Sequence, residues 1–97
     1  MRNIWISRAS GTGGSESVKL YVLRTCPYCI RVLRWLEGRD LPVQIVDVPF
    51  AHSQRADLRA VSGQTYVPTL VDGETVIADD DEAILEYLKE KERLRVA

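Results

Sequence analysis

Four short runs of apolar and β-branched residues along the chain have the pattern of β-strands. Such runs, bounded by turn-forming residues, are typical of strands, and the first of them is apolar enough to lie inside a sheet. The last two runs flank Asp72 and Gly73, an Asp-Gly pair that favours a tight hairpin turn. The four predicted strands are residues 18–23, 43–48, 68–71 and 75–77.

Three further segments have apolar residues at the spacing of α-helices. The first begins at Pro27, because proline at the first helical position loses no hydrogen bond. It ends before Gly38, a residue suited to the left-handed conformation that closes many helices. Residues 54–61 form a second, short helix. The last helix covers residues 79–93, and its opening acids resemble a capping box with Asp79 as the cap.

These elements follow one another in the order β-α-β-α-β-β-α. Because a helical crossover joins the first two strands, we expect them to run parallel, whereas the final hairpin adds an antiparallel edge. The sequence therefore predicts an α/β fold with a mixed four-stranded sheet and helices on both faces.

The first 17 residues differ in composition from the rest of the chain. Residues 10–15 (SGTGGS) are typical of a flexible linker, and this region lacks the apolar core of about 7–15 residues that a secretory signal needs. Residues 1–17 are therefore predicted to be a flexible or loosely packed extension without chemistry, and residues 18–97 to be the folded domain.

Composition and charge limit the classes of function that the chain can have. Its 97 residues suffice for one domain, and 45% hydrophobic with 28% charged residues is ordinary for a globular protein. No apolar run approaches the roughly 18 residues that cross a bilayer. The formal net charge of −1 gives no general attraction to nucleic acid or to acidic membranes, so neither is expected as a partner.

The two cysteines of the chain, Cys26 and Cys29, are separated by two residues. A disulfide across so small a loop constrains the unfolded chain very little, so a structural bridge is not expected. Two cysteines cannot complete a four-thiolate zinc site, and His52 could supply one further ligand at most. Two close thiols favour redox chemistry in a reducing compartment, and we expect a cytoplasmic protein. Metal binding, including a cluster shared across a dimer, and two incidental core thiols stay open as alternatives.

The predicted helix start gives the two cysteines different surroundings. Cys26 lies just before the helix, where unpaired N–H groups and the positive end of the helix dipole favour a thiolate, and Arg24 is a candidate for further positive charge. Cys29 lies in the first turn on the apolar face, so it is expected to be less exposed and less acidic. These differences predict that Cys26 attacks a substrate disulfide and that Cys29 resolves the mixed disulfide.

Two elements of the sequence resemble the glutaredoxin family. The CPYC motif at residues 26–29, directly after a predicted strand, is similar to the dithiol signature of that family, and residues 66–68 (YVP) lie where the family has a Thr-Val-Pro element. Residues 67–73 and 83–88 are also similar to the N-terminal domain of glutathione transferases. The resemblances cover about residues 18–92, and both imply a thioredoxin-like fold that binds glutathione.

The resemblance assigns glutathione contacts to particular residues. It implies that Pro68 follows a cis peptide bond and that the main chain of Val67 pairs with the cysteinyl part of glutathione. Tyr28 of the dithiol motif is a further predicted glutathione contact. Many glutaredoxins carry a basic residue three positions before the first cysteine; here that position is Leu23, and Arg24 follows it. Because a shift of one residue can reverse a side chain's direction, Arg24 either reaches the glycyl carboxylate or points to solvent.

Four consecutive acids, residues 79–82, lead into the last predicted helix. Helix capping and the helix dipole explain most of them. The resemblance implies that one or two also bind the γ-glutamyl ammonium of glutathione. Aligned with glutaredoxins these are Asp81 and Glu82, and aligned with transferases they are Asp80 and Asp81, so Asp81 is common to both alignments.

Together these inferences predict a glutathione-dependent thiol–disulfide oxidoreductase that reduces protein–glutathione mixed disulfides and protein disulfides. Glutathione is its expected co-substrate, no tightly bound cofactor or metal is needed, and the chain is expected to be a monomer. Three alternatives stay open: a glutaredoxin-like reductant recharged by an enzyme of the thioredoxin-reductase type, a carrier of a glutathione-ligated iron–sulfur cluster, and a glutathione-binding module without redox turnover.

Overall fold

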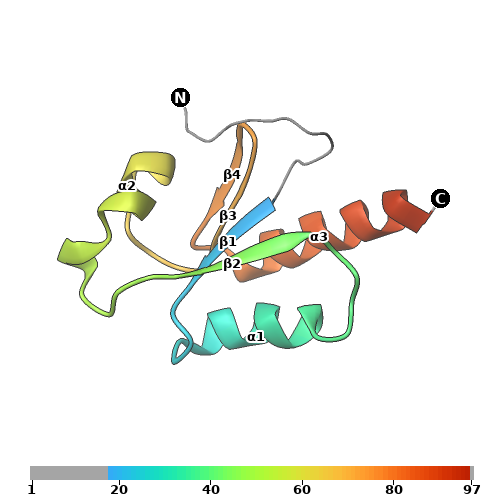
Figure 1. Cartoon of the computed structure of the whole chain (residues 1–97), viewed down its shortest axis with the longest axis horizontal. Coiled ribbons are helices and arrows are strands. Elements are labelled where there is room, and N and C mark those ends of the chain that lie inside the picture. The colour runs from blue at the N-terminus through green and yellow to red at the C-terminus, as the bar shows by residue number, and fades with distance from the viewer. Residues whose placement is uncertain (1–17, 97) are drawn as a thin grey trace.

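The computed structural model of the protein describes residues 18–96, with side chains as far as residue 94. A sheet of four strands in the order β2-β1-β3-β4 forms its centre, and β1 lies inside the sheet (Figure 1). The predicted extension 1–17 and Ala97 lie outside the described residues. The strands are β1 (Val18–Val22), β2 (Val43–Asp47), β3 (Thr69–Asp72) and β4 (Thr75–Ala78).

The strand pairing confirms the predicted mixed sheet. β1 runs parallel to β2 and antiparallel to β3, and β4 pairs antiparallel with β3. In Figure 1, α2 lies on the other side of the sheet from α1 and α3, so helices cover both faces in a thioredoxin-like arrangement. The helices are α1 (Pro27–Leu36), α2 (Ala56–Ser62) and α3 (Asp81–Val96), with a 3₁₀ turn at His52–Gln54.

Alternate residues of β1 face opposite layers of helices. Tyr21 lies with Leu58 of α2 around a hollow on one face, whereas Leu20 lies on the other face and is fully buried. Leu20 pairs laterally with Leu70 of β3, and both belong to one core with Ile84 of α3. Burial of such a side chain stabilises the fold by about 1.5–3 kcal/mol. The sheet and α3 are therefore a stable support for the neighbouring loops.

The start and the end of α1 follow the signals in the sequence. Cys26 is the N-cap residue, with extended dihedral angles (φ −84°, ψ 125°), and Pro27 is the first residue of the helix. Gly38 lies beyond the last turn with a φ of +76°, a left-handed conformation that glycine adopts without steric cost. The prediction that the dithiol motif opens a helix is confirmed.

The last helix begins two residues later than predicted, and the proposed capping box is wrong. Asp79 has a left-handed φ of +57°, and its N–H donates to the carbonyl oxygen of Pro68 at 2.9 Å, so it belongs to the preceding loop. Asp80 caps the helix instead, because its Oδ1 accepts a hydrogen bond from the N–H of Ala83 at 3.0 Å. Within a run of four acids, the tertiary contact made by Asp79 decides which of them is the cap.

Other element boundaries differ from the prediction by one to three residues, and three of them have a local explanation. β1 ends before Leu23, whose N–H is directed at a sulfur atom instead of a strand. α2 starts late because Arg55 has non-helical dihedral angles (φ −98°, ψ 51°). In the hairpin, Asp72 still pairs with the opposite strand. The two turn residues are therefore Gly73 and Glu74, and the positive φ of +62° falls on the glycine.

Candidate active site

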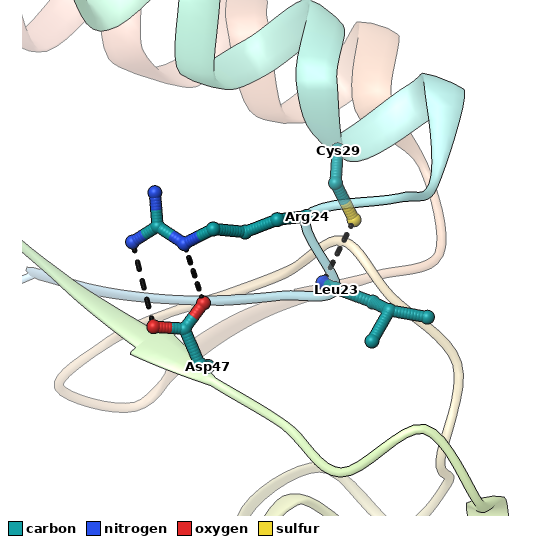
Figure 2. A network of polar contacts seen from close by, with 4 residues as sticks. All are labelled: Leu23, Arg24, Cys29 and Asp47. Atoms are coloured by element: carbon teal, nitrogen blue, oxygen red, sulfur yellow. Dashed lines mark hydrogen bonds and ion pairs between the residues drawn. The ribbon is translucent and has the colours of Figure 1, made fainter.

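The dithiol lies in the turn between β1 and α1, and its two sulfur atoms differ in exposure. Cys26 is half-buried, whereas Cys29 in the first turn of α1 is completely buried. The main chain of Leu23 contacts both residues. Its carbonyl oxygen accepts the N–H of Cys26 at 2.9 Å. Its N–H donates to Sγ of Cys29, with 3.4 Å between nitrogen and sulfur (Figure 2). One sulfur atom is thus open to a substrate, and the other is shielded by the core.

The surroundings of Cys29 keep its sulfur protonated at neutral pH. Burial is the main cause that raises the pKa of Cys29 to about 12, and the hydrogen bond and charge of the neighbouring Cys26 act in the same direction. The N–H of Leu23 and the charge of Arg55 act in the opposite direction, because both favour the thiolate. A cysteine that stays a thiol until it is needed suits the predicted resolving role.

This raised pKa predicts that the reduced protein loses stability in alkaline solution. Between the ordinary cysteine pKa of 9.0 and the raised value of about 12, the unfolded chain releases the Cys29 proton while the folded chain keeps it. The unfolded state then binds fewer protons, so this thiol should lower the free energy of unfolding by about 1.4 kcal/mol for each unit of pH increase. Denaturant unfolding between about pH 9 and 11, with a reductant present, measures the slope.

The matched control for this prediction is Cys29→Ala, which removes the titrating thiol. Burial and the hydrogen bond to Asp72 also raise the pKa of Tyr87 to about 12. Tyr87 therefore contributes equally to the pH dependence of the free energy of unfolding in both proteins. The difference between the two slopes therefore isolates Cys29, whatever the cavity left by alanine does to the absolute stability. Equal slopes in the two proteins would contradict the assignment.

A cleft of about 260 Å³ opens beside the dithiol turn. It is lined by Tyr28 of α1, by Pro68 before β3, and by the acids Asp79 and Asp81 at the start of α3. The peptide bond between Val67 and Pro68 is cis, as the resemblance implies. In the described part of the chain, the N–H and C=O of Val67 make no hydrogen bond, so these groups are free to pair with a ligand.

The acids of residues 79–82 have distinct positions. Asp81 lines the cleft, and its Oδ2 accepts a hydrogen bond from Nη1 of Arg31 on α1 at 2.6 Å. Asp80 caps the helix, and the exposed carboxylate of Glu82 lies 3.9 Å from Nη2 of Arg31. Three acids were predicted as glutathione contacts, and of these only Asp81 lines the cleft. Asp79, which the sequence assigned to the cap, lines the cleft as well; no local signal distinguishes it from its neighbours.

Arg24 is not among the residues that line the cleft. Its Nε donates to Oδ1 of Asp47 at the end of β2 at 2.7 Å, and its Nη2 lies 3.4 Å from Oδ2 of the same carboxylate (Figure 2). The side chain is directed toward Asp47 on β2, an orientation that the two alternatives left open by the sequence did not include. Arg24 thereby ties the dithiol turn to the neighbouring strand.

Arg55, for which the sequence suggests no role, connects two loops beside the site. It is 3% exposed. Its Nε, Nη1 and Nη2 donate to the carbonyl oxygens of Pro49, Thr65 and Phe50 at 2.7, 2.8 and 2.8 Å. Among residues 18–94, no carboxylate forms an ion pair with it, so three carbonyl dipoles compensate its charge. Arg55 thus fixes the loop that leads to Val67.

The described residues outside the dithiol offer little further chemistry of the predicted kinds. Nδ1 of His52 lies 3.0 Å from Oγ1 of Thr65, and its ring packs edge-on against Tyr66, so its contacts are with the loop before β3. Within residues 18–96, no group of three or more His, Cys, Asp or Glu side chains could hold a metal ion. The same part of the chain has no helix with the length and apolar character to cross a membrane.

Comparison with known proteins relates the chain to two groups. Residues 20–95 match the family described as glutathione S-transferase, N-terminal domain. A glutaredoxin of Pseudomonas aeruginosa is 32% identical over 65 residues, which cover 67% of this chain and 77% of the relative. A glutaredoxin-like 8.6 kDa protein in the rubredoxin operon of Clostridium pasteurianum is 29% identical over 75 residues, which cover 76% of this chain and 99% of the relative.

Solved structures show the same relationship. Human glutathione S-transferase T1-1 in its apo form matches with a TM-score of 0.70 and 25% identity. The match covers 79% of this chain and 33% of that chain, so the chain spans about a third of the length of that transferase.

Proposed function

The chain belongs to the glutaredoxin family and shares the thioredoxin-like fold of the N-terminal domain of glutathione S-transferases, and from this membership we propose that it is a glutathione-dependent thiol–disulfide oxidoreductase. The proposal rests above all on one observation: Cys26 is half-buried at the start of α1, while Cys29, three residues later, is completely buried. Such a pair provides one sulfur atom that attacks the substrate and a second that resolves the mixed disulfide. We place this activity in a reducing compartment, the cytoplasm, with the protein acting as a monomer.

The proposed reaction with a protein–glutathione mixed disulfide has two exchange steps. The Cys26 thiolate attacks the glutathione sulfur, the bond to the protein sulfur breaks, and the protein leaves as a thiolate that takes up a proton. The thiolate of a second glutathione then attacks the glutathione sulfur held on Cys26. This step releases oxidised glutathione and restores Cys26. Cys29 is not required in this route.

The proposed reaction with a protein disulfide uses both cysteines. Cys26 forms a mixed disulfide with one substrate sulfur, and the other substrate sulfur leaves as a thiol. Cys29 then attacks Cys26, a Cys26–Cys29 disulfide forms, and the second substrate sulfur leaves and is protonated. Two molecules of glutathione reduce the internal disulfide again and are oxidised in turn. No tightly bound cofactor takes part.

The cleft is the proposed site for glutathione. We propose that the main chain of Val67, beside Pro68, pairs with the cysteinyl part as an added strand would, and that Tyr28 covers it. Asp81, with Asp79 beside it, is the proposed partner of the γ-glutamyl ammonium. The other two predicted acids, Asp80 and Glu82, add negative charge at the start of α3 rather than direct contacts.

A second candidate reductant is supported by two ion pairs. Arg24 is paired with Asp47, and Asp81 is paired with Arg31, so both charges that glutathione was expected to use already have partners within the chain. Glutathione would have to share or displace these pairs, which weakens its binding relative to a site with unpaired charges. A flavoenzyme of the thioredoxin-reductase type, which would deliver electrons directly to the internal disulfide, does not need them.

The test is to supply a peptide–glutathione mixed disulfide and compare the two reductants. With glutathione, the wild-type protein and Cys29→Ser should both release the peptide thiol well above the uncatalysed rate, because the proposed route needs only Cys26. With NADPH and a thioredoxin reductase, Cys29→Ser should be inactive. Turnover that occurs only with the reductase and requires Cys29 would overturn the glutathione proposal and favour the second candidate.

A further inference from the structure

The main chain of Leu23 holds both reacting residues of the site. Its carbonyl oxygen accepts the N–H of Cys26. Its nitrogen atom lies 3.4 Å from Sγ of Cys29, to which it donates (Figure 2). Leu23 is the first residue after β1, so this N–H does not take part in strand pairing. A main-chain N–H that already donates to a buried sulfur atom can stabilise the negative charge when that sulfur becomes a thiolate.

The resolving step requires such a charge on Cys29. In this step the Cys29 thiol loses its proton, Sγ of Cys29 attacks Sγ of Cys26, and the bond between Cys26 and the substrate sulfur breaks. The departing substrate thiolate takes up one proton, so the two cysteines are oxidised and the substrate is reduced without any further reactant. Because Cys29 is fully buried, its thiolate cannot be stabilised by bulk water.

Attachment of the substrate to Cys26 changes the balance of groups around Cys29. While Cys26 is free, its sulfur opposes ionisation of Cys29, and only the Leu23 N–H and Arg55 favour it. Once Cys26 is bound in a mixed disulfide, its sulfur carries no charge and the opposition ends. The N–H of Leu23 is the favourable group in direct contact with the sulfur atom, whereas Arg55 donates to the carbonyl oxygens of the adjoining loops.

We propose that the main-chain N–H of Leu23 is a catalytic group of the resolving step, donating to Sγ of Cys29 as this sulfur becomes the attacking thiolate. This inference rests on the proposed function, because it concerns one step of that chemistry. The ion pair between Arg24 and Asp47 positions the main chain of Leu23 for this role. Val22, on the other side of Leu23, accepts the N–H of Val48 through its carbonyl oxygen at 2.9 Å, so both neighbours of Leu23 are tied to the end of β2 or to the residue after it.

The test replaces a single amide by an ester, which removes the N–H of Leu23 and keeps its side chain. Cys26 is a natural ligation site, so residues 1–25 can be synthesised with an ester between Val22 and residue 23 and joined to residues 26–97. The full chain results, with all side chains unchanged. The ester also makes the carbonyl oxygen of Val22, which accepts the N–H of Val48, a weaker acceptor; a general loosening of the turn by that change would slow both exchange steps and not the resolving step alone. An all-amide protein made in the same way, and one with an ester at Thr25, whose N–H makes no hydrogen bond in the described part of the chain, are the controls.

The resolving step is measured alone, by attaching an aromatic thiol to Cys26 as a mixed disulfide and following its release. We expect the ester at residue 23 to slow this release roughly tenfold, the effect of a hydrogen bond to a charged atom. Its pH profile should move to higher pH, and a purely structural role would not produce that shift. Attack of Cys26 on a mixed disulfide should change less than twofold. Equal release rates for the residue 23 ester and the all-amide protein, or equal losses in both steps, would overturn the proposal.

The ion pair is tested with Arg24→Met in the same assay. Because exposed ion pairs contribute little and are screened by salt, we expect a fewfold loss in resolution at low ionic strength and no loss at high ionic strength. An unchanged rate at low ionic strength would remove Arg24 from the inference. Since the mixed disulfide is prepared chemically, these results do not depend on glutathione being the reductant. Failure of the proposed function would appear separately, as absence of turnover with glutathione.

Discussion

Replacing Cys26 with serine is expected to reduce the release of a peptide thiol from its glutathione mixed disulfide to the uncatalysed rate. Thiol–disulfide exchange needs a thiolate as the attacking group, and a serine hydroxyl does not become one. Cys29 cannot take over the attack, because it is completely buried and burial keeps it protonated, with its pKa raised to about 12. The measurement is steady-state release with glutathione as the reductant.

The control for this prediction is Cys29→Ser, which keeps the attacking sulfur and lacks the resolving one. With a protein disulfide as substrate, this variant should stop at a stable mixed disulfide on Cys26, visible by intact mass. A limiting amount of an alkylating reagent should modify Cys26 of the reduced wild-type protein and leave Cys29 unmodified. Residual turnover in Cys26→Ser, or alkylation of Cys29 first, would contradict the assigned order of attack.

Replacing Arg55 with methionine is expected to destabilise the fold more than any exposed substitution. The change removes three hydrogen bonds from a buried guanidinium and leaves the carbonyl oxygens of Pro49, Phe50 and Thr65 without these donors. Loss of such a network costs about 2–4 kcal/mol. That is a large part of the roughly 5–15 kcal/mol by which domains are stable, and it should lower the melting temperature by at least about 8 °C.

Two further variants define the cause of this loss. Arg55→Lys keeps the charge, but a single ammonium cannot span three separate carbonyl oxygens, so much of the stability should still be lost. Arg59→Met changes an exposed arginine of α2, the helix that begins directly after Arg55, and should alter stability by no more than about 0.5 kcal/mol. If Arg55→Met unfolds at the same denaturant concentration as Arg59→Met, the loops beside the site do not depend on the buried guanidinium.

Local rules in the sequence predict the part of the site that local contacts build. The position of Cys26 before a helix that begins with Pro27 follows from the conformational preference of proline. The burial of Cys29 follows from its place on the apolar face of the same helix. The order of the strands and the covering of both faces follow from the limited ways in which helical crossovers and hairpins can connect strands.

Contacts between distant segments explain what the sequence does not reveal. Arg31 and Asp81 are paired although α1 and α3 are far apart in the chain, and no pattern of spacing signals such a pair. The loop position of Asp79 depends on a hydrogen bond to the carbonyl oxygen of Pro68. Arg55 lies where a short helix was expected, and charged residues there are normally exposed; its burial depends on carbonyl oxygens that two other loops supply.

The place of β1 inside the sheet also determines when the protein can fold during its synthesis. Of the four strands β1 leaves the ribosome first, but it pairs with β2 from 25 residues later (Val18 with Val43) and with β3 from 50 residues later (Leu20 with Leu70). Cys29 shares its core with Ile84 of α3, which is made later still. A nascent chain therefore leaves both thiols accessible until the last helix has emerged from the ribosome, and only the finished domain separates an exposed sulfur atom from a buried one.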